Sequence, residues 1–152
     1  MRYRLVAVGS LKRGPLAEAA ERYARLLRGL AALEVVEVKD RSALGPPEAR
    51  SRHAAESLRH ADGHLLLLDE RGEQLTTAEL AERVTGLERA GVSRLTLFLG
   101  GPDGHGAELR AAAHGALALS RLTLPHDLAR VVLLEQLYRV EALRSGHPYH
   151  RA

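Results

Sequence analysis

The sequence has no cysteine among its 152 residues. This absence excludes disulfides, metal sites built from thiolates and a cysteine nucleophile. It also has no apolar run that approaches the roughly 20 residues needed to span a membrane. The opening segment, "MRYRLVAVGSLKRG", contains an apolar run too short for a signal peptide, and no small-residue cleavage site follows it. We therefore expect no membrane segment and a cytoplasmic location.

Lysine is scarce as well, because arginine outnumbers it twenty to two. The formal net charge is +3, but residues 1–30 alone carry +5. The basic side chains of that segment are Arg2, Arg4, Lys12, Arg13, Arg22, Arg25 and Arg28. A guanidinium pairs with phosphate through two hydrogen bonds and stacks on bases, so the bias suits RNA. Codon usage or heat adaptation would produce the same bias, and charge alone does not separate the two explanations.

The length and the 45% hydrophobic content are sufficient for one domain with a core, spanning residues 1–152. Strand patterns and helix patterns alternate, without repeats. Strand patterns fall at 3–9, 33–38, 64–72, from 94, and within 116–125, and helix patterns at 15–30, 46–60, 76–89, 106–114 and 128–144. The strands lack polar alternation, which favours an α/β fold with a parallel sheet covered on both faces.

Local signals also predict how individual helices begin and how they pack. Thr76 and Glu79 form a capping box for the helix that follows them. Asp127 is in position to cap the last helix. The polar helix over 46–60 is expected to be exposed. The last helix has apolar residues on more than one stripe and should be buried on several sides, between the sheet and a second subunit. Core packing alone explains its leucines but not Arg130, Glu135 and Arg139.

Three segments follow strands and carry unusual chemistry: "LDERG", "LGGPDG" and "SRLTLP". In parallel sheets, ligands lie beyond the carboxyl ends of the strands. Gly100 and Gly101 come directly after a buried strand, where glycine allows positive φ and close approach of a ligand to backbone amides. Pro102 and Asp103 interrupt any dinucleotide fingerprint, and the Lys-Ser/Thr of a phosphate loop is missing. A tight turn between strand and helix gives the same pattern, so this motif alone leaves a ligand role open.

The last seven residues, "GHPYHRA", carry two histidines, a tyrosine and an arginine where chain ends are usually frayed. Together with "LVAVGSLK", "LLLLDERGEQLTTAELAERV", "FLGGPDG" and "SRLTLPHDLARVVLLEQLYRV", in this order, the chain closely resembles the RlmH-type methyltransferases of the SPOUT class. Members of that family modify a pseudouridine of large-subunit ribosomal RNA. One departure is Asp103, where many relatives have glutamate. The length suits this compact type, which lacks an added RNA-binding domain.

The resemblance implies a Rossmann-like α/β fold with a deep trefoil knot at the C-terminus. It also implies S-adenosylmethionine as methyl donor, no metal, and a homodimer with the C-terminal helix at the interface. Three loops would hold the cofactor, through Leu68, Gly100, Gly101, Ser120, Arg121, Leu122, Thr123, Leu124 and Pro125. Leucines and glycine amides would provide the apolar slot and backbone hydrogen bonds that an adenine ring needs.

The implied target, N3 of pseudouridine, is an imide N–H that is mostly protonated at neutral pH, so a base with a pKa near neutrality would help. We hypothesise that the tail supplies the groups around it. His147 or His150 would accept the proton, Tyr149 would stack on or bond the base, and Arg151 would bind phosphate. A tail that only packs against a partner subunit is the alternative, and the sequence does not choose the proton acceptor.

Two other functions compete with the methyltransferase. One is a non-catalytic RNA-binding module for ribosome assembly on the same fold, which would need neither an intact "LGGPDG" nor the tail. The other is an ordinary nucleotide-binding α/β enzyme. The intact motifs argue against the first, and the missing phosphate-loop lysine and Gly-x-Gly-x-x-Gly run argue against the second.

Overall fold

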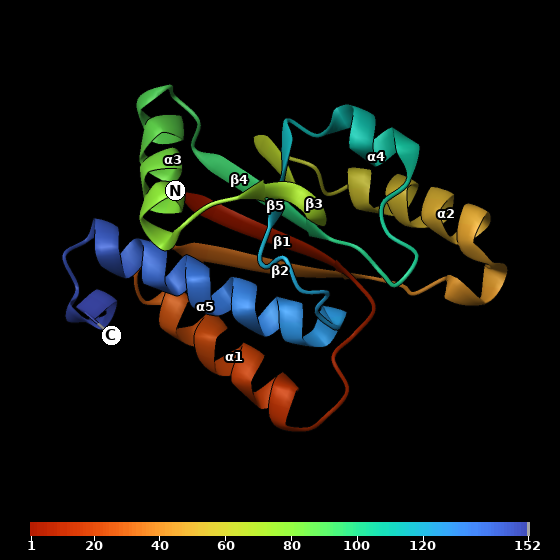
Figure 1. The fold of residues 1–152 in the computed structure, drawn as a ribbon, viewed down its shortest axis with the longest axis horizontal. Helices are drawn as coiled ribbons and strands as arrows, with labels where there is room; N and C mark the ends of the chain where they lie inside the picture. The colour runs from red at the N-terminus through yellow and green to blue at the C-terminus, as the bar shows by residue number, and fades with distance from the viewer. Residues whose placement is uncertain (152) are drawn as a thin grey trace.

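The computed structural model describes residues 1–151, without the side chains of His150 and Arg151. Its centre is one five-stranded sheet in the order β2-β1-β4-β3-β5 (Figure 1). Every neighbouring pair of strands in it is parallel, as the apolar strand patterns predicted. The strands are β1 (Arg2–Val8), β2 (Ala32–Val38), β3 (His64–Gln74), β4 (Arg94–Leu99) and β5 (Gly115–Ala118).

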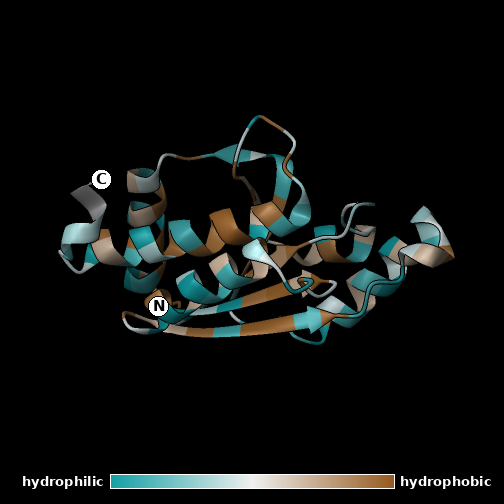
Figure 2. Ribbon diagram, turned by 90° about the horizontal axis from the view of Figure 1, so that it is seen from below, coloured by the Kyte–Doolittle hydropathy of each residue, from teal (hydrophilic) through white to brown (hydrophobic). Residues whose placement is uncertain are grey.

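Helices cover both faces of the sheet, which confirms the predicted α/β layers. The helices are α1 (Pro15–Arg28), α2 (Pro46–Leu58), α3 (Thr77–Arg89), α4 (Ala107–Ala112) and α5 (His126–Arg144), with short 3-10 helices η1 (Ser42–Leu44) and η2 (Pro148–Arg151). In Figure 1, α1, α3 and α5 lie on one side and α2 and α4 on the other. Bands of apolar and polar residues alternate along the helices in Figure 2, because each helix turns only part of its surface to the core.

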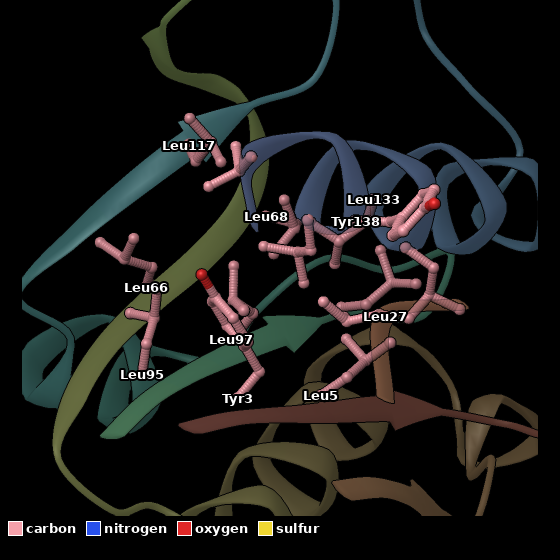
Figure 3. Close-up of a cluster of buried hydrophobic side chains, with 14 of the residues drawn as sticks. Tyr3, Leu5, Leu27, Leu66, Leu68, Leu95, Leu97, Leu117, Leu133 and Tyr138 are labelled. Carbon is pink, nitrogen blue, oxygen red and sulfur yellow. The ribbon is translucent and has the colours of Figure 1, made fainter. Parts of the chain in front are cut away.

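Two apolar clusters follow from the alternation of side chains along the strands. On one face, Leu5 and Leu97 pack beneath Leu133 of α5 (Figure 3). On the other face, Val6 and Phe98 pack with α2 and α4. A parallel sheet with helices on both faces therefore buries consecutive strand residues, which explains why the strands read as continuous apolar runs.

Two local predictions were wrong. The helix predicted to be exposed, α2, buries Ala49 and Ala54 completely and His53 almost completely. Its inward stripe consists of small and polar residues, so its apolar pattern is weak. Asp127 does not cap α5, which begins at His126 with Pro125 in the capping position and no side-chain cap. The capping box of α3 is confirmed, because both reciprocal hydrogen bonds of Thr76 and Glu79 are present.

Strand β3 continues past the predicted end and pairs with β5 twice. Leu117 of β5 is opposite Leu68 and again opposite Glu73, with a break in register between them. The segment 69–72 therefore bends closely around β5. A Cβ on Gly72 would lie 2.7 Å from the carbonyl carbon of Leu117, so only glycine fits at this contact.

Candidate active site

The carboxyl ends of β3, β4 and β5 surround a cavity of about 820 Å³. Its walls come from residues 68–71 in the bend of β3, from residues 99–105 after β4, and from residues 117–126, which lead from β5 to α5, with Ala129 of α5 behind them. Arg50 of α2 and Arg110 of α4 complete the lining. A cavity of this size, lined by leucines and loop backbone, is typical of a site for a small organic ligand.

The structure brings together eight of the nine residues that the sequence predicted to hold a cofactor. These are Leu68, Gly100, Gly101, Ser120, Leu122, Thr123, Leu124 and Pro125. Arg121 belongs to the same loop, but its side chain is exposed and does not line the cavity. The loops meet because β3, β4 and β5 are neighbours in the sheet, although they are far apart in the sequence.

The glycine loop, residues 100–106, differs from expectation in its backbone. Positive φ occurs at Gly104 (79°) and at neither Gly100 nor Gly101. Gly100 leaves room for a neighbouring side chain instead, because a Cβ there would lie only 3.1 Å from the ring of His105. The loop closes on itself through a hydrogen bond from Gly104 N–H to the Gly101 carbonyl at 3.0 Å.

Sequence reasoning missed three residues that tie the cavity walls together. His105 donates a hydrogen bond from Nε2 to the carbonyl of Leu68 at 2.8 Å, and burial lowers the pKa of its ring. Arg110 pairs with Asp69 at 2.7 Å and also donates to the His105 carbonyl at 3.3 Å. Burial acts to raise the pKa of Asp69, but hydrogen bonds from the Arg71 amide and Arg110 outweigh it, and the pKa is lowered. The charged stretch that follows the leucines of β3 was the signal available in the sequence.

The predicted catalytic tail lies away from this cavity. His126 and Ala129, at the start of α5, line the cavity, whereas the tail follows the other end of the helix (Figure 1). With 19 residues, α5 is about 28 Å long at a rise of 1.5 Å per residue. The structure therefore does not bring His147 or Tyr149 to the cavity of their own chain. His150 and Arg151 belong to η2, but their side chains are outside the described part of the structure.

The beginning of the tail is held firmly against α5. The Tyr149 hydroxyl donates to Glu135 at 3.1 Å, and its ring lies 4.5 Å from that of Tyr138. The guanidinium of Arg139 is 4.9 Å from the centre of the same ring and also pairs with Glu135. Burial and the charge of Glu135 raise the pKa of Tyr149 to about 12, so its hydroxyl is protonated at neutral pH. His147 is exposed, and its amide bonds the Ala142 carbonyl at 2.8 Å.

The outward faces of α1 and α5 form a partly apolar surface beside the tail. Leu16 and Leu26 of α1 are exposed, and Tyr23 is half-buried. Val131 and Val132 on α5 are half-buried as well. That a second subunit covers this surface stays a prediction.

Several basic residues of the N-terminal segment already have partners. Arg4 pairs with Glu34, and Arg28 with Glu21. The remaining exposed bases without a hydrogen bond or ion pair in the described residues are Lys12, Arg13, Arg22 and Arg25.

Among the described residues there is no group of three or more His, Cys, Asp or Glu side chains that could hold a metal ion. No helix in the described part of the chain is both long enough and apolar enough to cross a membrane.

A five-stranded parallel sheet with a cavity beyond β3, β4 and β5 is consistent with an α/β methyltransferase. Residues 1–150 match the family described as "Predicted SPOUT methyltransferase", and the chain belongs to this family.

Two relatives show how complete the similarity is. "Ribosomal RNA large subunit methyltransferase H" of Thermus thermophilus is 43% identical over 152 residues, covering 99% of each chain. The protein of the same name from Synechococcus sp. (strain CC9311) is 39% identical over 151 residues, covering 99% of this chain and 97% of its own. A solved structure titled "a probable methylase family protein from Haemophilus influenzae Rd KW20" shares the fold alone. It has 14% identity and a TM-score of 0.55, covering 97% of this chain and 69% of that chain.

Proposed function

We propose that the protein is an S-adenosylmethionine-dependent methyltransferase that methylates N3 of a pseudouridine in large-subunit ribosomal RNA. The observation that carries this proposal is the cavity assembled from three loops of a SPOUT family member. The full-length relatives named as ribosomal RNA large subunit methyltransferases support the RNA substrate. A cytoplasmic location fits such a substrate. A titration with S-adenosylmethionine, followed by transfer of labelled methyl to ribosomal RNA, tests the proposal directly.

The residues of the cavity fit this cofactor. Leu117, Leu122 and Leu124 offer apolar surface for an adenine ring, and the glycine loop offers backbone amides. When bound, S-adenosylmethionine supplies a methyl group on an electrophilic sulfonium, so the chemistry needs no metal. The task left to the protein is to orient the target base and to accept the N3 proton.

The groups for that task would come from a second copy of the chain. Because the cavity lies at the start of α5 and the tail follows its other end, the tail of one protomer does not reach the cavity of the same chain. In a twofold dimer with the α5 helices antiparallel, the tail of one chain would approach the cavity of the other. The partly apolar outward faces of α1 and α5 provide surface for that contact. In this arrangement His147 or His150 accepts the proton, Tyr149 orients the base and Arg151 binds phosphate.

We also propose that the C-terminal part is knotted. The support is the double pairing of β3 around β5, which encloses the strand that leads to α5. When the unfolded chain is stretched by its ends, a trapped knot should leave it shorter than its full length of 152 residues at about 3.6 Å each. A full contour length in every pull would contradict the knot.

The substitution Gly101→Val should weaken cofactor binding. A Cβ at this position would lie 3.2 Å from Cγ1 of Val8, so a branched side chain forces the glycine loop to move. We expect the affinity for S-adenosylmethionine to fall at least tenfold, about 1.4 kcal/mol, with the fold retained by circular dichroism. Unchanged affinity in calorimetry would remove this loop from the site. An RNA-binding module without catalysis would show no cofactor binding even in the unmodified protein.

Reversing the charges of Arg22 and Arg25 to glutamate should weaken ribosome binding. Both side chains are exposed on α1 and have no hydrogen bond or ion pair in the described residues, so they are available to phosphate. The dependence of affinity on salt should flatten, because fewer counterions are released on binding. Reversal of Arg59 and Arg89, which are also exposed, is the matched control for net charge. If both double variants behave alike, the arginine excess is compositional.

A further inference from the structure

Two buried histidines lie beneath the glycine loop, outside the groups that the proposed reaction uses. His53 of α2 is 4% exposed and His105 is 8% exposed. Both border a small internal space of about 10 Å³, which Ser57, Phe98 and the glycine loop also line. This is the volume in which about one water can sit.

The one hydrogen bond of the His53 ring within the described part of the chain determines which ring nitrogen carries the proton. Its Nε2 accepts the backbone N–H of Arg41 at 2.8 Å, so this nitrogen has its lone pair free. A neutral ring with a lone pair on Nε2 has its proton on Nδ1. That Nδ1 is buried and has no partner among the described residues. A buried donor of this kind normally has a protein or water partner.

His105 has the complementary state. Its Nε2 lies 2.8 Å from the Leu68 carbonyl, which can only accept, so Nε2 bears the proton and Nδ1 has a lone pair. Burial lowers the pKa of this ring, which favours the neutral form. The absence of a side chain at Gly100 leaves room at this edge, because a Cβ there would lie 3.2 Å from Nδ1. One small space is thus bordered by one ring with a free donor and another with a free acceptor.

We propose that a single ordered water in this space accepts the Nδ1–H of His53 and donates to Nδ1 of His105. The two histidines are then positioning residues for the cavity. A continuous path of hydrogen bonds runs from the Arg41 amide, through both rings, to the Leu68 carbonyl at the cavity wall. The path holds the glycine loop against α2 and the end of β3.

The packing of Gly106 supports a fixed distance between the two rings. A Cβ at this position would lie 2.6 Å from the backbone oxygen of Arg50 and 2.9 Å from Cβ of Ala54. The chain after His105 is therefore pressed directly against α2, and the separation of His53 from His105 is set by backbone contact. That the positioned wall serves a cofactor rests on the proposed function.

Glutamine substitutions test the link, because the glutamine amide can replace Nε2 but has no counterpart of Nδ1. His53→Gln can still accept from the Arg41 amide, and His105→Gln can still donate to Leu68. Each should weaken binding of S-adenosylhomocysteine about fivefold, the effect of one lost hydrogen bond. The double variant should also lose about fivefold rather than about twenty-fivefold, because both changes break one link.

His114→Asn is the matched control. His114 accepts the backbone N–H of Leu65 on Nδ1 at 2.9 Å, which the asparagine oxygen can replace, and it lies just before β5 and does not line the cavity. It should leave cofactor affinity unchanged. If the losses multiply in the double variant, or if His114→Asn loses as much affinity as the single variants, the link between the two rings is overturned.

Nitrogen-15 NMR of the histidine rings gives a readout that is independent of cofactor binding. It should place the proton of His53 on Nδ1 and that of His105 on Nε2. The opposite state of either ring would overturn the inference. If the unmodified protein failed to bind S-adenosylhomocysteine, the proposed function would fail. The positions of the ring protons would still test this inference, and so would the losses of thermal stability in the single and double variants, which should not add.

Discussion

Removal of residues 147–152 should abolish methyl transfer to ribosomal RNA and leave S-adenosylmethionine binding intact. The tail carries the candidate proton acceptor, and general-base catalysis contributes roughly 10²- to 10⁴-fold. We therefore expect single-turnover transfer of labelled methyl to fall at least about 100-fold. Cofactor binding should persist because the cavity is at the opposite end of α5, lined by His126 and Ala129.

Single substitutions separate catalysis from packing within the tail. Tyr149→Phe keeps the ring against Tyr138 and Arg139 but loses the hydrogen bond to Glu135. His147→Gln changes an exposed side chain without touching the core.

Near-normal transfer by the truncated protein would mean that the tail only packs, and the base must be sought elsewhere. Loss of cofactor binding together with transfer would mean that the tail belongs to the cavity or to the dimer contact.

A mixture of two inactive variants should recover activity if each site uses both chains of a dimer. One variant lacks residues 147–152, and the other carries Ser120→Trp, which places an indole in the cavity wall. In a mixed dimer, the intact cavity of the first chain receives the intact tail of the second. Random pairing makes half of the dimers mixed, each with one complete site, so about a quarter of the unmodified activity should return.

The dimer itself is measured by sedimentation, where the mass should be about twice the 16.5 kDa of the chain. The matched control combines both changes in one chain and mixes that chain with the unmodified chain. If each site uses both chains, a mixed dimer then has no complete site, and only dimers of two unmodified chains are active. A monomer in solution, or no recovery in co-expressed mixtures, would count against a site shared between chains.

The strand patterns determined the class of fold, because a parallel sheet covered on both faces requires apolar residues at consecutive positions. The glycine loop could also be predicted from the sequence, since Gly100 and Gly101 directly follow the buried apolar residues of β4. The Thr76 capping box could be predicted because it involves only neighbours along the chain. In each case the information is local.

What only the tertiary structure decided depends on contacts between distant segments. The sheet order places β3, β4 and β5 side by side, and this alone turns three separate loops into one cavity. The inward stripe of α2 is small and polar, so its burial becomes evident only when α4 and the sheet pack on it. An arginine is normally expected at the surface, yet Arg130 is 3% exposed and donates a hydrogen bond to the carbonyl of Gly9, 121 residues away in the sequence. The length of α5 was predicted from the sequence, but only the fold shows that this helix begins at the cavity and ends away from it, because that depends on where the helix is anchored.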